Sequence, residues 1–142
     1  HKIKLPLFPK EFFKKLVESP FGKFFLIRYN GAISGGSVCL ELKNRRLYEF
    51  FVCGTDRKLR NVFPSTLATW AAIEYAAKNG FSHFDMMGAG KPNDEYGVRE
   101  FKAKFGGDLV DYGRFIYICN PILFAMGKLG LSLIRQINFL KI

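Results

Sequence analysis

The chain has few of the residues that carry metal, redox or hydrolytic chemistry. Its 142 residues include three cysteines and two histidines, and one histidine is the first residue. Three widely spaced cysteines, Cys39, Cys53 and Cys119, argue against a disulfide framework and against a zinc site. With His83 as the one internal histidine, no Ser-His-Asp or Cys-His arrangement can be assembled. We therefore predict no bound metal and three buried, reduced thiols, as is usual for a cytosolic protein.

Long apolar runs, central glycines and acidic residues are also scarce. No stretch of about 18 residues is apolar throughout, so the sequence predicts no membrane-spanning helix. Gly54 is the only glycine between Gly36 and Gly80, so few backbone positions in that region can approach a phosphate closely. The 12 Asp and Glu against 22 Lys and Arg give a net charge of +10. Such a charge attracts anionic partners but does not choose among them.

Aromatic and aliphatic residues dominate what is present. Hydrophobic residues make up 49% of the chain, and Phe occurs 16 times. This composition excludes a disordered chain and predicts a large aromatic core. A chain of this length forms one domain. Because it begins with His1 rather than Met, we expect it to be a piece of a longer protein.

Hydrophobic periodicity predicts a helix, three strands and a second helix over the first 79 residues. Asn-Gly at 30–31 and Asn-Arg at 44–45 predict tight turns, so the strands should form an antiparallel meander. In the second helix an apolar face that includes Leu67 and Trp70 is expected to be buried, with Trp70 as a core residue. The expected ranges are Lys10–Ser19, Lys23–Tyr29, Ile33–Leu42, Leu47–Cys53 and Thr66–Asn79.

The basic loop between the third strand and the second helix holds Arg57, Lys58 and Arg60. These cations precede the free N–H groups of a helix start, which is a favourable place for an anion. The alternative is that the loop is simply hydrated.

The stretch Phe81–Tyr112 combines a short apolar strand, a glycine-broken turn and a short amphipathic helix, Glu95–Phe105. Val98, Phe101 and Phe105 share one stripe of that helix, and Glu95, Arg99 and Lys102 share a neighbouring one. The charged stripe is either a solvated face or a contact for an anionic group. A further strand is expected at Leu109–Ile118.

From Pro121 onward the pattern predicts an amphipathic C-terminal helix. Such a basic amphipathic helix either packs on a partner domain or lies on an anionic membrane surface. Its apolar stripe consists of Ile122, Met126, Leu129, Leu133, Ile137 and Leu140.

Three features together resemble the C-terminal half of the Fem family of aminoacyl transferases. They are the Asn-Gly helix end at 79–80, the segment FSHFDMMG at 81–88 and the segment REFKAKFGG at 99–107. The resemblance covers roughly Pro9 to Tyr117, and its most specific part is Phe101-Lys102 followed by Phe105-Gly106-Gly107.

The resemblance implies an α/β (α+β) domain of the GNAT-like acyltransferase fold, with a mixed, largely antiparallel sheet flanked by helices. Residues 1–120 would form this domain and residues 121–142 the C-terminal amphipathic helix. The missing N-terminal domain of a two-domain protein would complete the groove, so the piece alone is expected to fold but to be inactive. The implied reaction moves an amino acid from aminoacyl-tRNA to an amine of a nucleotide- or lipid-linked peptidoglycan precursor. The implied location is cytoplasmic, or peripheral on the inner face of the plasma membrane through residues 121–142.

The resemblance also implies roles for particular residues. Phe101 and Lys102 correspond to the pair associated with the donor end, where an ammonium group would stabilise negative charge that develops on oxygen. Arg99 would be a secondary anion contact, and Tyr96 would add a hydroxyl at the cleft edge. Asp85 either holds the turn that follows its strand or binds substrate.

No cofactor is implied, because Fem proteins take their donor from aminoacyl-tRNA. GNAT acetyltransferases carry a glycine-spaced pyrophosphate loop where this chain has residues 54–65, and nothing of that form is present. Two alternatives remain open: an N-acyltransferase with another activated donor, and a non-catalytic basic module that docks tRNA or membrane.

Overall fold

A computed structural model describes residues 8–42, 45–90, 95–113 and 115–140 of the chain. It divides into a unit at Phe8–Leu109 and a second unit that includes the chain from Val110. The first unit contains the sheet and every candidate site residue. In chain order the elements are α1 (Lys10–Glu18), β1 (Gly22–Tyr29), β2 (Ala32–Leu42), β3 (Arg46–Gly54), α2 (Pro64–Lys78), β4 (His83–Asp85), α3 (Gly97–Ala103) and α4 (Pro121–Leu140).

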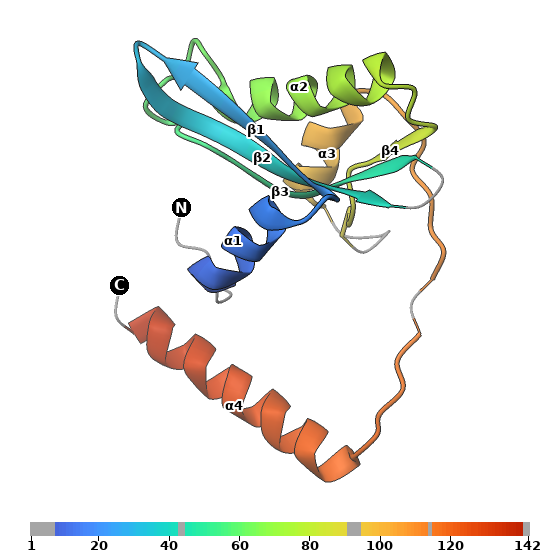
Figure 1. The fold of residues 1–142 in the computed structure, drawn as a ribbon. Helices are drawn as coiled ribbons and strands as arrows, with labels where there is room; N and C mark the ends of the chain where they lie inside the picture. Colours follow the sequence, from blue (N-terminus) through green and yellow to red (C-terminus); the bar gives the residue numbers. More distant parts are fainter. Residues whose placement is uncertain (1–7, 43–44, 91–94, 114, 141–142) are drawn as a thin grey trace. The chain divides into compact units, whose positions relative to one another are not determined.

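The sheet has the order β1-β2-β3-β4, and Figure 1 shows it between α1 and α2. The pairs β1–β2 and β2–β3 are antiparallel, as hairpin turns require, whereas β4 pairs in parallel with Arg46–Tyr48 of β3. Helix α2 is the crossover that parallel pairing needs. The expected mixed, largely antiparallel sheet is confirmed.

One extra residue in β3 sorts its side chains between the two faces. Cys39 pairs with Glu49 but Val38 pairs with Phe51, so Phe50 is a β-bulge. Phe50 and Phe51 therefore both contact rings of α1. Glu49 instead faces α2, where it meets Thr69.

Helix α2 packs on the sheet through small residues rather than through its large ones. Ala68, Ala72 and Ala76, four residues apart, are buried, and Ala72 and Ala76 form a core cluster with Cys39 and Leu47. The expectation that Trp70 is a core residue is wrong, because its side chain is 54% exposed. The alanine stripe lets the helix backbone approach the sheet closely, which turns the larger residues outward.

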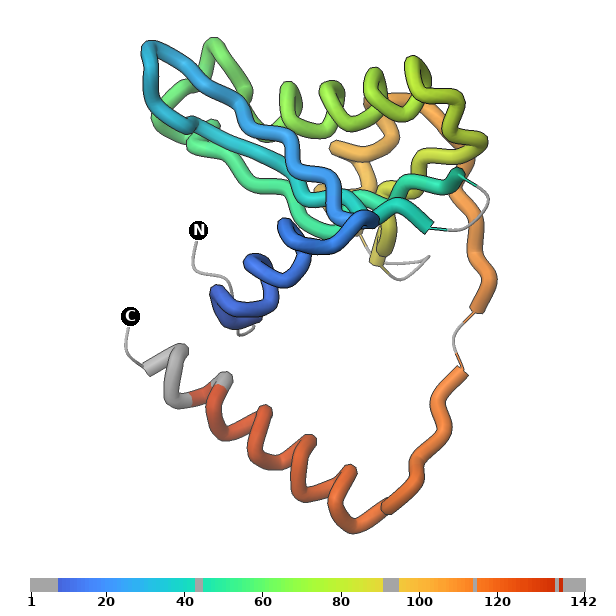
Figure 2. Tube along the Cα trace, in the orientation of Figure 1, coloured from blue at the N-terminus to red at the C-terminus, as the bar shows by residue number. Residues whose placement is uncertain are grey.

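Helix α1 covers the opposite face of the sheet, as Figures 1 and 2 show. The α1 rings Phe12 and Phe13 join Phe8, which precedes the helix, and the bulge rings in one aromatic cluster. Phe8 stacks on Phe12 at 4.5 Å, and Phe13 lies 5.4 Å from Phe51 between ring centroids. Such ring contacts add to the free energy gained from area burial alone.

The strand expected at Leu109–Ile118 is not present. Residues 109–113 and 115–118 have the alternating sequence pattern of a strand but pair with no other strand. Tyr112 and Tyr117 are almost fully exposed. An alternating apolar pattern makes a strand only where a neighbour supplies backbone hydrogen bonds. Residue 114 lies outside the described residues.

The cysteine expectation holds for Cys39 and fails for the other two. Cys39 is buried in the core, whereas Cys53 and Cys119 are exposed free thiols. Cys53 lies in the last three residues of β3, all of which are exposed, and Cys119 lies in the unpaired segment before α4.

Helix α4 forms as expected and begins at Pro121, where the Asn120 side chain accepts hydrogen bonds from the N–H groups of Ile122 and Leu123. Along the described part of α4 the apolar side chains are exposed. Among the described residues, no helix is both long and apolar enough to cross a membrane.

Candidate functional site

The candidate site forms where loop 86–90, which follows β4, meets α3. Lys102 of α3 donates hydrogen bonds from Nζ to Met86 O and, at 2.8 Å, to Gly88 O. Arg99, three residues earlier on the same helix, donates from Nε to Ala89 O at 2.9 Å. Two cations of one short helix therefore hold the carbonyl groups of this loop.

The loop has a specific backbone shape that its neighbours support. Met87 and Gly90 both have positive φ, 60° and 77°, a conformation that is costly for Met. The Asp85 carboxylate accepts a hydrogen bond from Met87 N at 2.6 Å, which stabilises the turn. The Tyr96 ring packs against Gly90, where an added Cβ would lie 2.7 Å from Tyr96 Cδ1. The sequence-predicted residues Asp85, Tyr96, Arg99 and Lys102 thus come together around one loop.

The Lys102 ammonium is half-buried. Burial lowers the pKa of Lys102, while the negative charges of Glu49 and Asp85 act in the opposite direction. A lysine ammonium has three N–H donors, and two are used by the loop carbonyls. Among the described residues the third has no acceptor, so it can be given to an oxygen of a bound molecule.

Phe101 points elsewhere on α3. Its ring packs edge to face on Phe105, with centroids 5.2 Å apart. Neighbouring helical residues point about 100° apart, so Phe101 and Lys102 do not share a face. Phe101 is half-buried and fixes the helix that carries Lys102.

Glu49 and Thr69 form a buried polar pair next to this site that was not singled out from the sequence. Glu49 follows Tyr48, which pairs with Asp85 of β4. Glu49 is 5% exposed, and its Oε1 accepts a hydrogen bond from Thr69 Oγ1 at 2.8 Å. Burial raises the pKa of Glu49, while the Thr69 hydrogen bond and the Lys102 charge lower it. The available signal was an acidic residue inside the apolar run LYEFFVC, since carboxylates are almost never fully buried without a partner.

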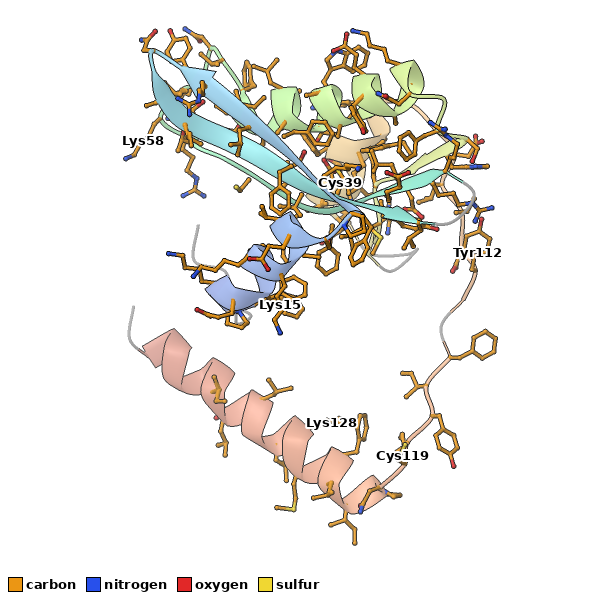
Figure 3. The ribbon with its side chains drawn as sticks, viewed as in Figure 1. Lys15, Cys39, Lys58, Tyr112, Cys119 and Lys128 are labelled. Atoms are coloured by element: carbon orange, nitrogen blue, oxygen red, sulfur yellow. The ribbon has the colours of Figure 1, made fainter. Side chains whose placement is uncertain are left out.

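The basic loop lies apart from these residues. Arg57, Lys58 and Arg60 are exposed, and Figure 3 shows Lys58 at the end of the sheet away from β4. The start of α2 also already has a carboxylate, because Asp56 Oδ1 accepts hydrogen bonds from Ser65 N at 3.0 Å and from Ser65 Oγ at 2.9 Å. The structure therefore does not bring the three cations together with Lys102.

No group of three or more metal-ligating side chains occurs within the described ranges.

Solved structures similar to this chain share one fold. An aminoglycoside acetyltransferase from an uncultured soil metagenomic sample, solved with trehalose, is 14% identical with a TM-score of 0.60 over 82% of this chain and 78% of that one. A ribosomal-protein-alanine N-acetyltransferase from Brucella melitensis biovar Abortus 2308 is 11% identical, with a TM-score of 0.58 over 75% and 76%. An aminoglycoside N-acetyltransferase in complex with CoA is 8% identical, with a TM-score of 0.53 over 75% and 81%. A search of curated proteins found no significant match.

The sheet order, the β3–α2–β4 crossover and these similarities define the GNAT acyltransferase fold. Residues 32–129 match the FemAB family. The chain belongs to the FemAB family, and its loop 86–90, α3 and the Glu49–Thr69 pair all lie inside the matched range.

Proposed function

We propose that this chain is the C-terminal domain of a two-domain transferase that moves an amino acid from aminoacyl-tRNA to an amine of a peptidoglycan precursor. The acceptor amine attacks the ester carbonyl, a C–N bond forms, and the C–O bond to the tRNA ribose breaks. The proton lost by the amine goes to the departing ribose oxygen. Negative charge develops on the carbonyl oxygen during the attack.

The observation that carries the proposal is the Lys102 ammonium, which is half-buried beside loop 86–90 and has a third N–H donor that no described residue accepts. A fixed cation in partly desolvated surroundings stabilises a developing oxyanion, or a phosphate of the bound donor, more than it would in water. Arg99, Tyr96 and Asp85 fix the loop and the helix on either side of it. Family membership supports the same class of reaction.

Coenzyme A is the less favoured donor. One neighbour of this fold was solved with CoA, but here the start of α2 holds the Asp56 carboxylate. A pyrophosphate arriving there would meet a like charge, and Gly54 is the one glycine available in that loop. Arg57, Lys58 and Arg60 would instead contact the tRNA backbone from the exposed surface.

The acceptor and the location belong to the same proposal. A nucleotide- or lipid-linked precursor would sit largely on the N-terminal domain and in the groove shared with it. The protein would act in the cytoplasm, and α4 would contact either that domain or the inner face of the plasma membrane.

The test is turnover by the full-length protein with charged tRNA or with an acyl-CoA thioester. We expect transfer from tRNA, and we expect Lys102→Met to lower kcat by roughly 10²- to 10³-fold, as loss of one oxyanion donor does. Lys104→Met is the matched control, because Lys104 is exposed two residues further along. Thioester use would promote a different donor, and wild-type turnover by Lys102→Met would remove Lys102 from the chemistry. Salt-sensitive tRNA binding without turnover would favour a docking module.

A further inference from the structure

Glu49 lies where an acidic residue is costly. It lies in the middle of β3, on the face of the sheet that α2 covers, and is 5% exposed. Thr69, whose hydroxyl donates a hydrogen bond to its carboxylate, is fully buried. A side chain such as Met or Leu at this position would avoid the desolvation of a carboxylate. The carboxylate therefore calls for a partner beyond Thr69.

Burial raises the pKa of Glu49, and the positive charge of Lys102 acts in the opposite direction. The ion pairs within 4.0 Å among the described residues are Lys23–Glu41 and Lys78–Glu74, so Glu49 acts on Lys102 at longer range. Charges interact strongly across partly desolvated space even without direct contact. Tyr48 of β3 pairs with Asp85 of β4, so Glu49 and Met86 are the next residues along these two adjacent segments. Met86 O accepts a hydrogen bond from Lys102 Nζ, which brings the ammonium to the part of the chain beside Glu49.

We propose that Glu49, oriented by Thr69, is a positioning residue whose carboxylate keeps the Lys102 ammonium charged and directed at loop 86–90. The importance of that ammonium for transfer rests on the proposed function, but the link between the two charges does not. In this arrangement the sheet supplies the counter-charge, and the loop carbonyls supply the direction.

The other ionisable groups around the pair do not replace this link. Asp85 also acts on Lys102, from β4, and its carboxylate is already bonded to Met87 N. Cys39 faces Glu49 from β2, and burial, followed by the Glu49 charge, raises the pKa of its thiol to about 12. The thiol is therefore neutral over the working pH range and adds no charge.

The test measures when Lys102 loses its proton. The rate at which acetic anhydride acylates each lysine of the 142-residue chain would be followed against pH by peptide mass spectrometry, since only the neutral amine reacts. We expect Glu49→Gln to move the midpoint for Lys102 to lower pH. Glu41→Gln is the matched control, because Glu41 is a carboxylate of the same sheet that pairs with Lys23, and it should leave that midpoint unchanged.

A second pair of variants covers the case in which Glu49→Gln does not fold, as judged by circular dichroism. Thr69→Val removes the hydroxyl that orients the carboxylate and should move the Lys102 midpoint in the same direction, whereas Thr69→Ser should restore it. An unchanged midpoint in a folded Glu49→Gln or Thr69→Val protein overturns the inference.

Turnover separates this inference from the proposed function. In the full-length protein a positioning role predicts that Glu49→Gln lowers kcat by roughly ten- to a hundredfold with little change in KM. A shifted midpoint with no transfer from any donor would end the proposed function and leave the charge link intact. Wild-type kcat in Glu49→Gln despite a shifted midpoint would overturn the positioning role.

Discussion

At the scale of single residues, tertiary packing brings together charged side chains that lie far apart in the sequence, as well as those that are close in it. Lys102 and Arg99 both direct their donors at backbone carbonyls of loop 86–90. Glu49 lies more than 50 residues earlier in the chain, yet its negative charge counteracts the lowering of the Lys102 pKa by burial. The bulge at Phe50 makes this possible, because it leaves Glu49 facing α2 while the next two rings face α1.

Thiol reactivity should distinguish the three cysteines. Burial raises the pKa of the Cys39 thiol to about 12, and only the thiolate reacts readily. We expect a maleimide at pH 7.5 to label Cys53 and Cys119 in the native chain and to label Cys39 only in denaturant, as counted by intact mass. Rapid native labelling of Cys39 would show that the face of the sheet beneath α2 opens to solvent.

Glu49 should also make stability depend on pH. Its pKa is raised in the folded state, so the folded protein holds that proton to higher pH than the unfolded chain does. The associated stability is present below the unfolded value and is lost as pH rises through the folded pKa. We therefore expect the free energy of unfolding of wild type, relative to Glu49→Gln, to fall in urea titrations as pH rises from the unfolded pKa through the raised, folded pKa of Glu49. A difference that stays flat with pH would contradict the burial of a carboxylate at position 49.

At the scale of elements, the local sequence pattern predicts the hairpins and helices, but it does not predict which face of a helix is buried. The Asn-Gly turn and the strand periodicity predict β1 to β3, and the ends of α1 are correct to within a residue. The apolar residues of α2 suggested the wrong buried stripe, because size counts as well as hydrophobicity: alanines allow close approach, and Trp70 does not. The strand expected at 109–118 failed for a related reason, since a pairing partner cannot be read from the segment itself.

The loop and helix of the site could be predicted from the sequence, whereas the neighbouring Glu49–Thr69 pair could not. Asp85, Tyr96, Arg99 and Lys102 lie within one stretch of 18 residues, so their proximity follows from a strand, a turn and a helix in succession. Glu49 and Thr69 reach the site only through the tertiary packing of β3 and α2. A bulge, which reverses the facing of every later residue, leaves little trace in composition.

The contact between β2 and the start of α2 should be sensitive to one methyl group. A Cβ at Gly35 would lie 2.8 Å from Pro64 Cβ and 3.0 Å from Cys53 O. We expect Gly35→Ala to destabilise the fold by about 1–3 kcal/mol in urea unfolding, as overpacking does. Gly97→Ala is the control, since nothing lies within 4 Å of its added Cβ. It should be neutral or stabilise by up to about 1 kcal/mol through helix propensity. Equal stability of both variants would mean that α2 can move away from the sheet.

At the scale of the whole molecule, the net charge of +10 sets how the chain meets polyanions. An excess of positive charge can attract a large anionic partner at surfaces outside the candidate site. Arg57, Lys58 and Arg60 are exposed, and Lys58 lies at the end of the sheet away from β4 (Figure 3). The loop that carries them is therefore suited to a backbone contact remote from Lys102.

The salt dependence of tRNA binding tests that role. For the full-length protein we expect log affinity to fall linearly with log salt concentration, with each lost phosphate contact reducing the slope by roughly 0.7 to 0.9. Replacing Arg57, Lys58 and Arg60 by Ala should reduce the slope by the amount expected for the loss of about two to three phosphate contacts. A triple Ala variant of Lys10, Lys14 and Lys15, which are exposed on α1, should change it less. Equal effects would indicate attraction by overall charge alone.

The bulge in β3 restricts how this strand can change in length. Deleting Phe50 would restore strict alternation, and the residues on one side of the deletion would then exchange the faces to which their side chains point. Either the aromatic cluster under α1 would lose Phe51, or the acid that acts on Lys102 would turn away from α2. Related proteins that keep α1 and α2 on the two faces of the sheet, together with the residues at positions 49 and 102, should therefore keep the extra residue of the bulge, whatever its side chain.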